Sequence, residues 1–162
     1  MKRLLVLLAA ALAAILLSAA SCEGEKTVTE PTTDESTVAL EPVTVVQQSI
    51  PGGRGGTVRE VIRDQTAWAE AWTELGLDGA PPAVDFGQEM ILVAAMETQS
   101  CVSKVTIRSV SEQGGELVVD ILEAPPAPNC VCVTAERPIH AVRVRKADAP
   151  PRYNVERGQT PC

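Results

Sequence analysis

The sequence has few aromatic residues and no excess of positive charge. Its four aromatic side chains are Trp68, Trp72, Phe86 and Tyr153, and its formal net charge is −7 at pH 7. Proteins that bind single-stranded nucleic acid stack bases on aromatic rings, and nucleic-acid binders in general attract phosphates with a basic field. Because both features are missing, nucleic acid is excluded as a partner.

Histidine is scarce as well, which limits the chemistry that the chain can perform. The one histidine, His140, alternates with Val142 and Val144 and so falls on the apolar side of a predicted strand. We expect it to be buried, neutral and hydrogen-bonded to the backbone. The carboxylates that stand out are scattered and form no readable acid–base pair: Asp64, Glu112, Glu116 and Asp120. The sequence predicts no catalytic residue, no metal site and no cofactor.

The N-terminal residues have the pattern of a bacterial lipoprotein signal. Lys2 and Arg3 precede an apolar run at residues 4–17, and small residues then lead to Cys22. A membrane-spanning helix needs about 20 apolar residues, so this shorter run is typical of a cleaved signal. Ala19-Ala20-Ser21-Cys22 resembles a lipobox, with Ala19 where leucine is commoner. We predict a signal peptide at residues 1–21 and a lipidated Cys22 that anchors the exported protein to a bacterial membrane.

An ordinary secreted protein, cut near Ser21, is the alternative to a lipoprotein. The composition after Cys22 argues against it, because residues 22–42 are rich in Glu, Thr, Pro and Ser without a hydrophobic period. Such a segment is typical of a disordered tether. We therefore predict a tether at residues 22–42, one globular domain at residues 43–155 and a C-terminal tail at residues 156–162. The domain faces the periplasm or the cell exterior.

The four remaining cysteines indicate disulfides. They are Cys101, Cys130, Cys132 and Cys162, an even number in an exported chain. Neighbours at i and i+2 in a strand lie too far apart to pair, so Cys130 and Cys132 each need a distant partner. A zinc site built from these thiols and His140 is the rival interpretation, but the spacing matches no usual zinc pattern.

Hydrophobic periodicity predicts a small α+β domain. Residues 43–46 and the continuously apolar residues 90–96 indicate strands, and residues 57–62 fit either a strand or a helix. Asp64 is a suitable N-cap for a helix that ends at Leu75, before Gly76. Trp68 and Trp72 share one face of this helix, which we expect to pack on a sheet. The glycine-rich residues 51–56 lack the lysine and hydroxyl residue of a phosphate loop and are predicted to form a mobile connection.

The second half of the domain is predicted to be mostly strand. Residues 104–108 and 117–121 alternate apolar and polar side chains around Gly114-Gly115, which indicates a hairpin. After a proline-rich loop, residues 131–134 and 138–146 indicate two further strands. The expected fold is an antiparallel sheet of about five or six strands with one packed helix.

A short basic strip lies near the end of the domain. It consists of Arg137, Arg143, Arg145 and Lys146 on an otherwise acidic chain. A solvated strand face explains the strip without a partner, and an acidic partner or a phospholipid surface is the alternative.

The order of these features resembles the C-terminal domain of the protease complex subunit PrcB family. The shared features begin with the helix that carries Trp68 and Trp72 and with Asp85-Phe86 before an apolar strand. They continue with the hairpin turn at Gly114-Gly115, the proline-rich loop that ends in Asn129-Cys130, and the final strand through His140. The resemblance covers about residues 61–146, and it is the order of the features that is distinctive.

The resemblance implies a non-enzymatic, membrane-associated domain that binds and stabilises a surface or secreted protease. The chain departs from the family at Ser100-Cys101-Val102-Ser103, where a Gly-Gly-Tyr stretch is common. This departure suggests that a disulfide between Cys101 and Cys130 makes the loop rigid instead.

The sequence therefore predicts a lipid-anchored accessory protein that contacts another extracytoplasmic protein through exposed loops or a sheet edge. Two alternatives belong to other classes. One is a structural envelope lipoprotein without a dedicated partner, and the other is a metal-dependent enzyme that uses His140 with nearby cysteine thiols.

Overall fold

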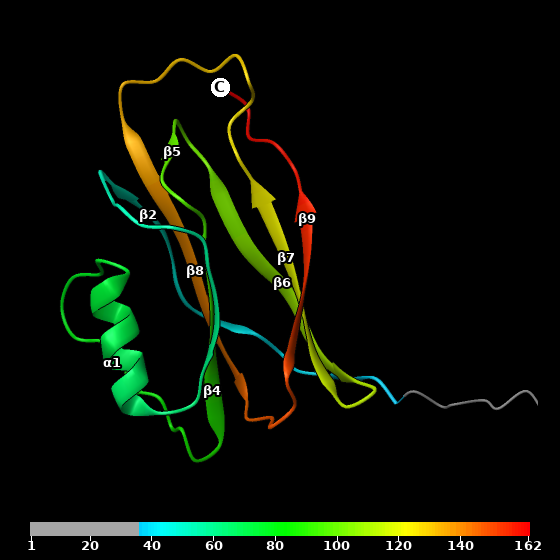
Figure 1. The fold of residues 1–162 in the computed structure, drawn as a ribbon. Coiled ribbons are helices and arrows are strands. Elements are labelled where there is room, and N and C mark those ends of the chain that lie inside the picture. The colour runs from blue at the N-terminus through cyan, green and yellow to red at the C-terminus, as the bar shows by residue number, and fades with distance from the viewer. Residues whose placement is uncertain (1–35) are drawn as a thin grey trace, which may run out of the picture. The chain divides into compact units, whose positions relative to one another are not determined.

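Nine strands and one helix make up residues 36–162, the part of the chain that the computed structural model describes (Figure 1). The strands are β1 (Val38–Ala39), β2 (Val43–Pro51), β3 (Val58–Ile62), β4 (Glu89–Ala95), β5 (Gln99–Ser100), β6 (Lys104–Gln113), β7 (Glu116–Ala124), β8 (Ala135–Arg145) and β9 (Pro151–Arg157). The helix is α1 (Gln65–Glu74). The predicted signal peptide, the predicted lipidation site Cys22 and the tether up to residue 35 lie outside the described residues.

The strands form two sheets. Sheet A has the order β1-β6-β7-β9, and sheet B has the order β2-β8-β4-β3, with β5 also paired to β8. All neighbours are antiparallel except β7 and β9, which run parallel. Sheet B lies between sheet A on one face and α1 on the other, as Figure 1 shows.

Strand β4 explains why there are three layers. Met90, Leu92 and Ala94 point into the core between the two sheets, whereas Ile91 and Val93 point into the core under α1. All five side chains are at most 1% exposed. A strand that is apolar on both faces needs a cover on each side. Helix α1 covers one face of β4, and sheet A covers the other.

The fold is therefore mainly β, and the predicted α+β fold with one antiparallel sheet needs correction. The strands with alternating apolar residues were correctly predicted, but they belong to two sheets that cover each other. Leu117, Val119 and Ile121 of β7 pack against β4 and β8 across the interior. Alternation along a strand shows that one face is buried, but it does not show which element buries it.

Helix α1 begins and ends where its sequence predicts. The Asp64 side chain accepts a hydrogen bond from the Ala67 N–H at 2.8 Å, which caps the first turn. At the other end, Gly76 has a φ of +74°, and the Leu77 N–H donates to the Trp72 carbonyl at 3.1 Å. Trp68 is fully buried, which confirms that the tryptophan face is core.

The predicted hairpin is confirmed, and the predicted strand at residues 131–134 is wrong. Strands β6 and β7 pair from Gln113 opposite Glu116, and Gly114 and Gly115 both have positive φ. Residues 131–134 have no strand partner, and Val131 and Val133 are almost fully exposed. Residues 57–62, which fit either structure, contain strand β3.

The folded domain extends past both predicted boundaries. At the N-terminal side, β1 pairs with β6 and Leu40 is only 2% exposed, so the last residues of the predicted tether belong to the fold. At the C-terminal side, β9 continues to Arg157 and Thr160 bonds to the Pro125 carbonyl. The predicted boundaries at residues 43 and 155 are therefore too narrow.

The glycine-rich loop is shaped by a buried arginine. The Arg137 guanidinium donates to the Gly56 carbonyl at 3.1 Å and to the Glu74 carbonyl at the end of α1 at 3.4 Å. A Cβ atom on Gly55 would lie 2.5 Å from Arg137 Cζ, and Gly55 has a φ of +145°. Only glycine fits at this position, because its backbone lies directly against the guanidinium.

Candidate functional site

The environment of His140 is that of a structural residue. Its ring is 3% exposed between the two sheets. Nδ1 accepts a hydrogen bond from the Ile107 N–H of β6 at 2.8 Å, and Nε2 lies 3.2 Å from Thr44 Oγ1. Because Nδ1 accepts, the neutral ring carries its proton on Nε2. Burial, and then the positive charge of Lys104, lower the pKa of His140. The predicted buried, neutral histidine is confirmed. Its hydrogen bond with the Ile107 N–H joins sheet B to sheet A.

Protonation of His140 is expected to destabilise the domain below pH 6.5. The ring takes up a proton at its ordinary pKa of 6.5 in the unfolded chain but at a lower pH in the folded domain. Stability is therefore complete above pH 6.5 and falls as the pH drops toward the folded pKa, by at most about 1.4 kcal/mol per pH unit for one proton. Urea unfolding between pH 7 and pH 5 measures this slope.

The matched variant for this test is His140→Asn. An asparagine Oδ1 atom can accept from the Ile107 N–H but does not titrate. We expect H140N to unfold with a flatter pH dependence between pH 5 and pH 7 than the unmodified protein. Equal slopes for the two proteins would contradict the assignment of this pH dependence to His140.

The predicted basic strip does not form one basic surface. Arg137 is 3% exposed under the glycine-rich loop. Arg143 and Arg145 each lie 3.6 Å from a carboxylate oxygen, of Glu89 and Glu112 respectively. Lys146 Nζ donates to the Phe86 carbonyl at 3.1 Å. Each of the four cations thus has a partner within the domain. The two ion pairs lie at the surface, where the Arg145 side chain stays 62% exposed.

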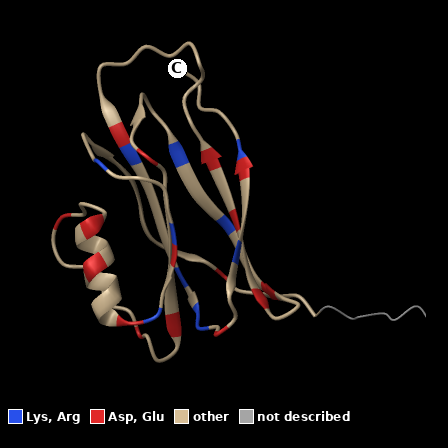
Figure 2. Cartoon of the chain, viewed as in Figure 1, with Lys and Arg blue, Asp and Glu red and all other residues tan. Residues whose placement is uncertain are grey.

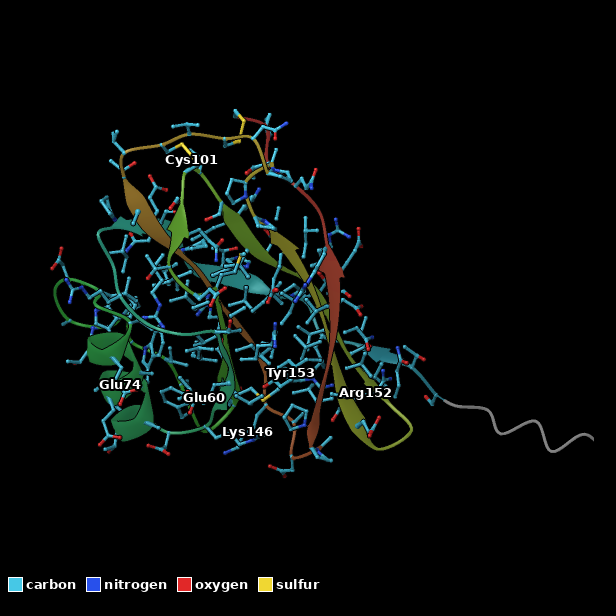
Figure 3. All side chains as sticks on the ribbon, turned by 45° about the horizontal axis from the view of Figure 1, so that its top comes forward. Glu60, Glu74, Cys101, Lys146, Arg152 and Tyr153 are labelled. Atoms are coloured by element: carbon cyan, nitrogen blue, oxygen red, sulfur yellow. A yellow bond between two sulfur atoms is a disulfide. The ribbon has the colours of Figure 1, made fainter. Side chains whose placement is uncertain are left out.

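The predicted carboxylates also have structural partners: Asp64 caps α1, and the others form hydrogen bonds or ion pairs at the surface. Asp120 accepts from Ser109, and from Asn154 at 2.9 Å; these hydrogen bonds lower the pKa of Asp120. Glu116 lies 2.8 Å from Arg152, which Figure 3 labels on β9. Within residues 36–162, no group of three or more His, Cys, Asp or Glu side chains could hold a metal ion.

The four cysteines form two long-range disulfides, as the sequence predicts, but with other partners than the resemblance suggested. Cys101 pairs with Cys132 and Cys130 pairs with Cys162, so the suggested bridge between Cys101 and Cys130 is not formed. The reason is the path of the backbone. The Cys101 N–H bonds to the Thr134 carbonyl at 3.2 Å, which brings Cys101 to Cys132. All four thiols are therefore unavailable as metal ligands for the enzyme alternative.

The bridges fix a loop that has no regular structure of its own. We call residues 125–134 the stapled loop; it connects β7 to β8 and arches over the end of both sheets, next to the C-terminus (Figure 1). The Ala127 N–H bonds to the Thr160 carbonyl at 3.1 Å, and the Thr160 N–H bonds to the Pro125 carbonyl at 2.9 Å. Two disulfides, these hydrogen bonds and three prolines restrict the conformations of the loop.

Three exposed valines surround the bridge between Cys101 and Cys132. Val131 is 96% exposed, Val133 is fully exposed, and Val102 is 62% exposed. Each is the sequence neighbour of a cysteine in this bridge, whose Cα atoms lie 5.0 Å apart. We call these three residues the valine tip.

The valine tip is also free of charge. Residues 125–134 contain no Asp, Glu, Lys or Arg, and Figure 2 shows the stapled loop uniformly tan at the end of the sheets. In Figure 3 the labelled Cys101 marks the same end of the domain. Single exposed apolar residues are common, and loops positioned by a rigid scaffold are where proteins often place their binding residues.

The disulfides indicate where the domain resides. Two bridges in a small domain are stable in an oxidising compartment outside the cytoplasm.

Among residues 36–162, no helix is long and apolar enough to span a membrane. Comparison with known proteins gives no match to a family model, a curated protein or a solved structure.

Proposed function

We propose that this protein is a lipid-anchored, extracytoplasmic accessory protein that binds another protein through the valine tip. The observation that carries the proposal is the exposure of Val102, Val131 and Val133 around a disulfide that makes their loop rigid. Burying the three side chains against a partner would stabilise the complex by about 1.5–3 kcal/mol for each fully buried valine.

The rigidity of the stapled loop favours binding. A flexible loop loses conformational entropy when it is held against a partner, at a cost of about 0.5–1.5 kcal/mol for each immobilised side chain. Both disulfides and the hydrogen bonds of Thr160 restrict the stapled loop before binding. Valine adds little cost of its own, because its β-branched side chain has few rotamers.

The lipid anchor at Cys22 is the second part of the proposal. It rests on the lipobox at residues 19–22, and the disulfides support an export route. We expect full-length protein from a lipoprotein-processing bacterium to begin at Cys22, to carry added acyl mass and to lack four hydrogens. Intact mass with alkylation under non-reducing conditions measures all three. An unacylated chain with free thiols would contradict both the anchor and the bridges.

The proposed partner is an extracytoplasmic protease or another envelope protein. A protease follows from the resemblance to the PrcB family, in which the C-terminal domain accompanies a surface or secreted protease.

Replacing the valine tip with serine tests the binding surface. We expect the triple variant Val102→Ser, Val131→Ser and Val133→Ser to lose its partner while keeping its stability, because all three side chains are exposed. The measurement is the molar ratio of co-purified protein after gentle detergent extraction from the native membrane. A loss of at least about tenfold corresponds to about 1.4 kcal/mol.

The control for this test is a second triple variant on the exposed face of α1. Thr66→Ser, Ala69→Ser and Thr73→Ser are small exchanges at exposed positions away from the stapled loop. This variant should retain the partner in full. Equal partner recovery with both triple variants, or no stoichiometric partner for the unmodified protein, would contradict the proposal.

A further inference from the structure

Strand β2 is the one long, uncharged edge among the described strands. The outermost strands of the two sheets are β1, β9, β2 and β3. Strand β1 has only two residues, β3 carries Arg59 and Glu60, and β9 carries Arg152 and Glu156. Strand β2 has nine residues, and no residue from 42 to 53 is charged. Proteins normally protect an edge strand by shortness, charge, proline or a β-bulge. In β2 the irregularity between Thr44 and Val46 and the proline at position 51 leave residues 46–50 as a regular, uncharged edge.

The outer backbone groups of β2 are directed away from its one neighbour, β8. The Gly52 N–H donates to the Ala135 carbonyl, so Ile50, Gln48 and Val46 also bond to β8, as far as the register shift between Thr44 and Val46. The residues between them, Gln47 and Ser49, therefore point their N–H and C=O groups outward. Proline at position 138, opposite Ser49, agrees with this register because it has no N–H to donate.

From this edge we infer that β2 pairs antiparallel with β2 of a second copy of the protein. The two B sheets would then join into one continuous sheet, with a twofold axis near Gln47. This inference does not depend on the lipid anchor or on the valine tip.

The sequence of β2 fits a copy of itself better than a foreign strand. A residue that lies on the twofold axis is opposite its own copy, so a charged residue at that position would face a like charge. Gln47 avoids this repulsion because its amide carries no charge. Its Nε2 donates to Thr106 Oγ1 at 3.3 Å, and its second N–H and its oxygen can bond to the amide of the second copy. In the same arrangement β3 would place Glu60 opposite its own copy. The charges of β9 are already paired within the domain, Arg152 with Glu116 and Glu156 with Arg108.

The charges that flank β2 favour the antiparallel direction. Glu41 precedes the strand and Arg54 follows it; both are exposed, and neither forms an ion pair within residues 36–162. Antiparallel pairing brings Glu41 of one copy toward Arg54 of the other, at both ends of the interface. Parallel pairing would place like charges beside each other.

The expected dimer is weak. One strand edge buries less surface than the roughly 1,200–2,000 Å² of a standard interface. We therefore expect a dissociation constant on the order of 10 μM. The measurement is sedimentation velocity of the full-length protein over a concentration series, with detergent micelles in excess so that two copies do not share a micelle by chance.

Two variants of Gln47 and one matched control decide the interface. Gln47→Glu places like charges at the axis, and Gln47→Pro removes an outward N–H without removing a bond to β8. Both should weaken the dimer at least about tenfold, or about 1.4 kcal/mol. Gln65→Glu makes the same chemical change at an exposed position on α1 and should leave the dimer unchanged.

Hydrogen exchange on the unmodified protein gives an independent result if a variant folds poorly. The amides of Gln47 and Ser49 should exchange more slowly as the protein concentration rises, while those of Gln48 and Ile50, bonded to β8, should not change. A protein that stays monomeric to about 1 mM, or a dimer that forms without slowing exchange at Gln47 and Ser49, overturns the inference.

Discussion

Reduction of both disulfides is expected to remove most of the stability of this domain. The bridges close loops with sequence separations of 31 and 32 residues. For loops of this length, chain entropy gives about 3–4 kcal/mol for each bridge. The two loops share only residues 130–132, so the two contributions should nearly add. Their sum is comparable to the roughly 5–15 kcal/mol that stabilises a typical domain.

Urea unfolding of the oxidised and the reduced protein measures this loss. Two double variants separate the bridges: Cys101→Ser with Cys132→Ser, and Cys130→Ser with Cys162→Ser. Each should lower the free energy of unfolding by about 3–4 kcal/mol. The first should also release the stapled loop next to the valine tip, because Cys101 is 4% exposed and holds the loop to the sheets. Equal unfolding midpoints with and without reductant would count against both bridges.

The second large effect is expected at Trp68. This side chain is fully buried between α1 and sheet B. Its Nε1 donates to the Pro82 carbonyl at 3.2 Å, and its ring meets Trp72 edge to face with 5.2 Å between centroids. Trp68→Ala leaves a cavity and an unpaired carbonyl, so it should destabilise the domain by about 3–5 kcal/mol.

The matched control for Trp68 is Thr66→Ala on the exposed side of the same helix. Its effect should stay within about 0.5 kcal/mol, as for most surface substitutions. Urea unfolding followed by the fluorescence of the remaining Trp72 gives the midpoint for the variant. A Trp68→Ala midpoint close to that of Thr66→Ala would show that α1 does not depend on this contact.

Local signals in the sequence predict the individual elements well. Asp64 and Gly76 bound α1, and Gly114-Gly115 turns the hairpin, because caps and tight turns depend on neighbouring residues alone. The continuous apolar run of β4 correctly predicts a strand buried on both faces.

The second sheet is not predictable from such signals. Strand β9 begins at Pro151, carries charges along its length and pairs in parallel with β7, so neither its pattern nor its partner is local. Strand β1 has two residues, too few for any period to show. Each strand forms because a strand distant in the sequence has an edge with which it can pair: β6 for β1, and β7 for β9.

The candidate site is predicted only in part. The even number of cysteines predicts two disulfides, but their partners depend on where Thr134 and Thr160 bond in the folded chain. Val131 and Val133 suggest a strand because β-branched residues favour one. No charge in residues 125–134 marks this segment as exposed, so the exposure of Val131 and Val133 is known only from the structure.

The most direct test of the central claim is a photo-cross-link from the valine tip in the native membrane. A benzophenone amino acid replaces Val131 in one strain and Thr66, an exposed residue of α1, in another. We predict one discrete adduct with a single extracytoplasmic protein from position 131 and none from position 66. No adduct from position 131, or the same adducts from both positions, would contradict a protein-binding role for the tip.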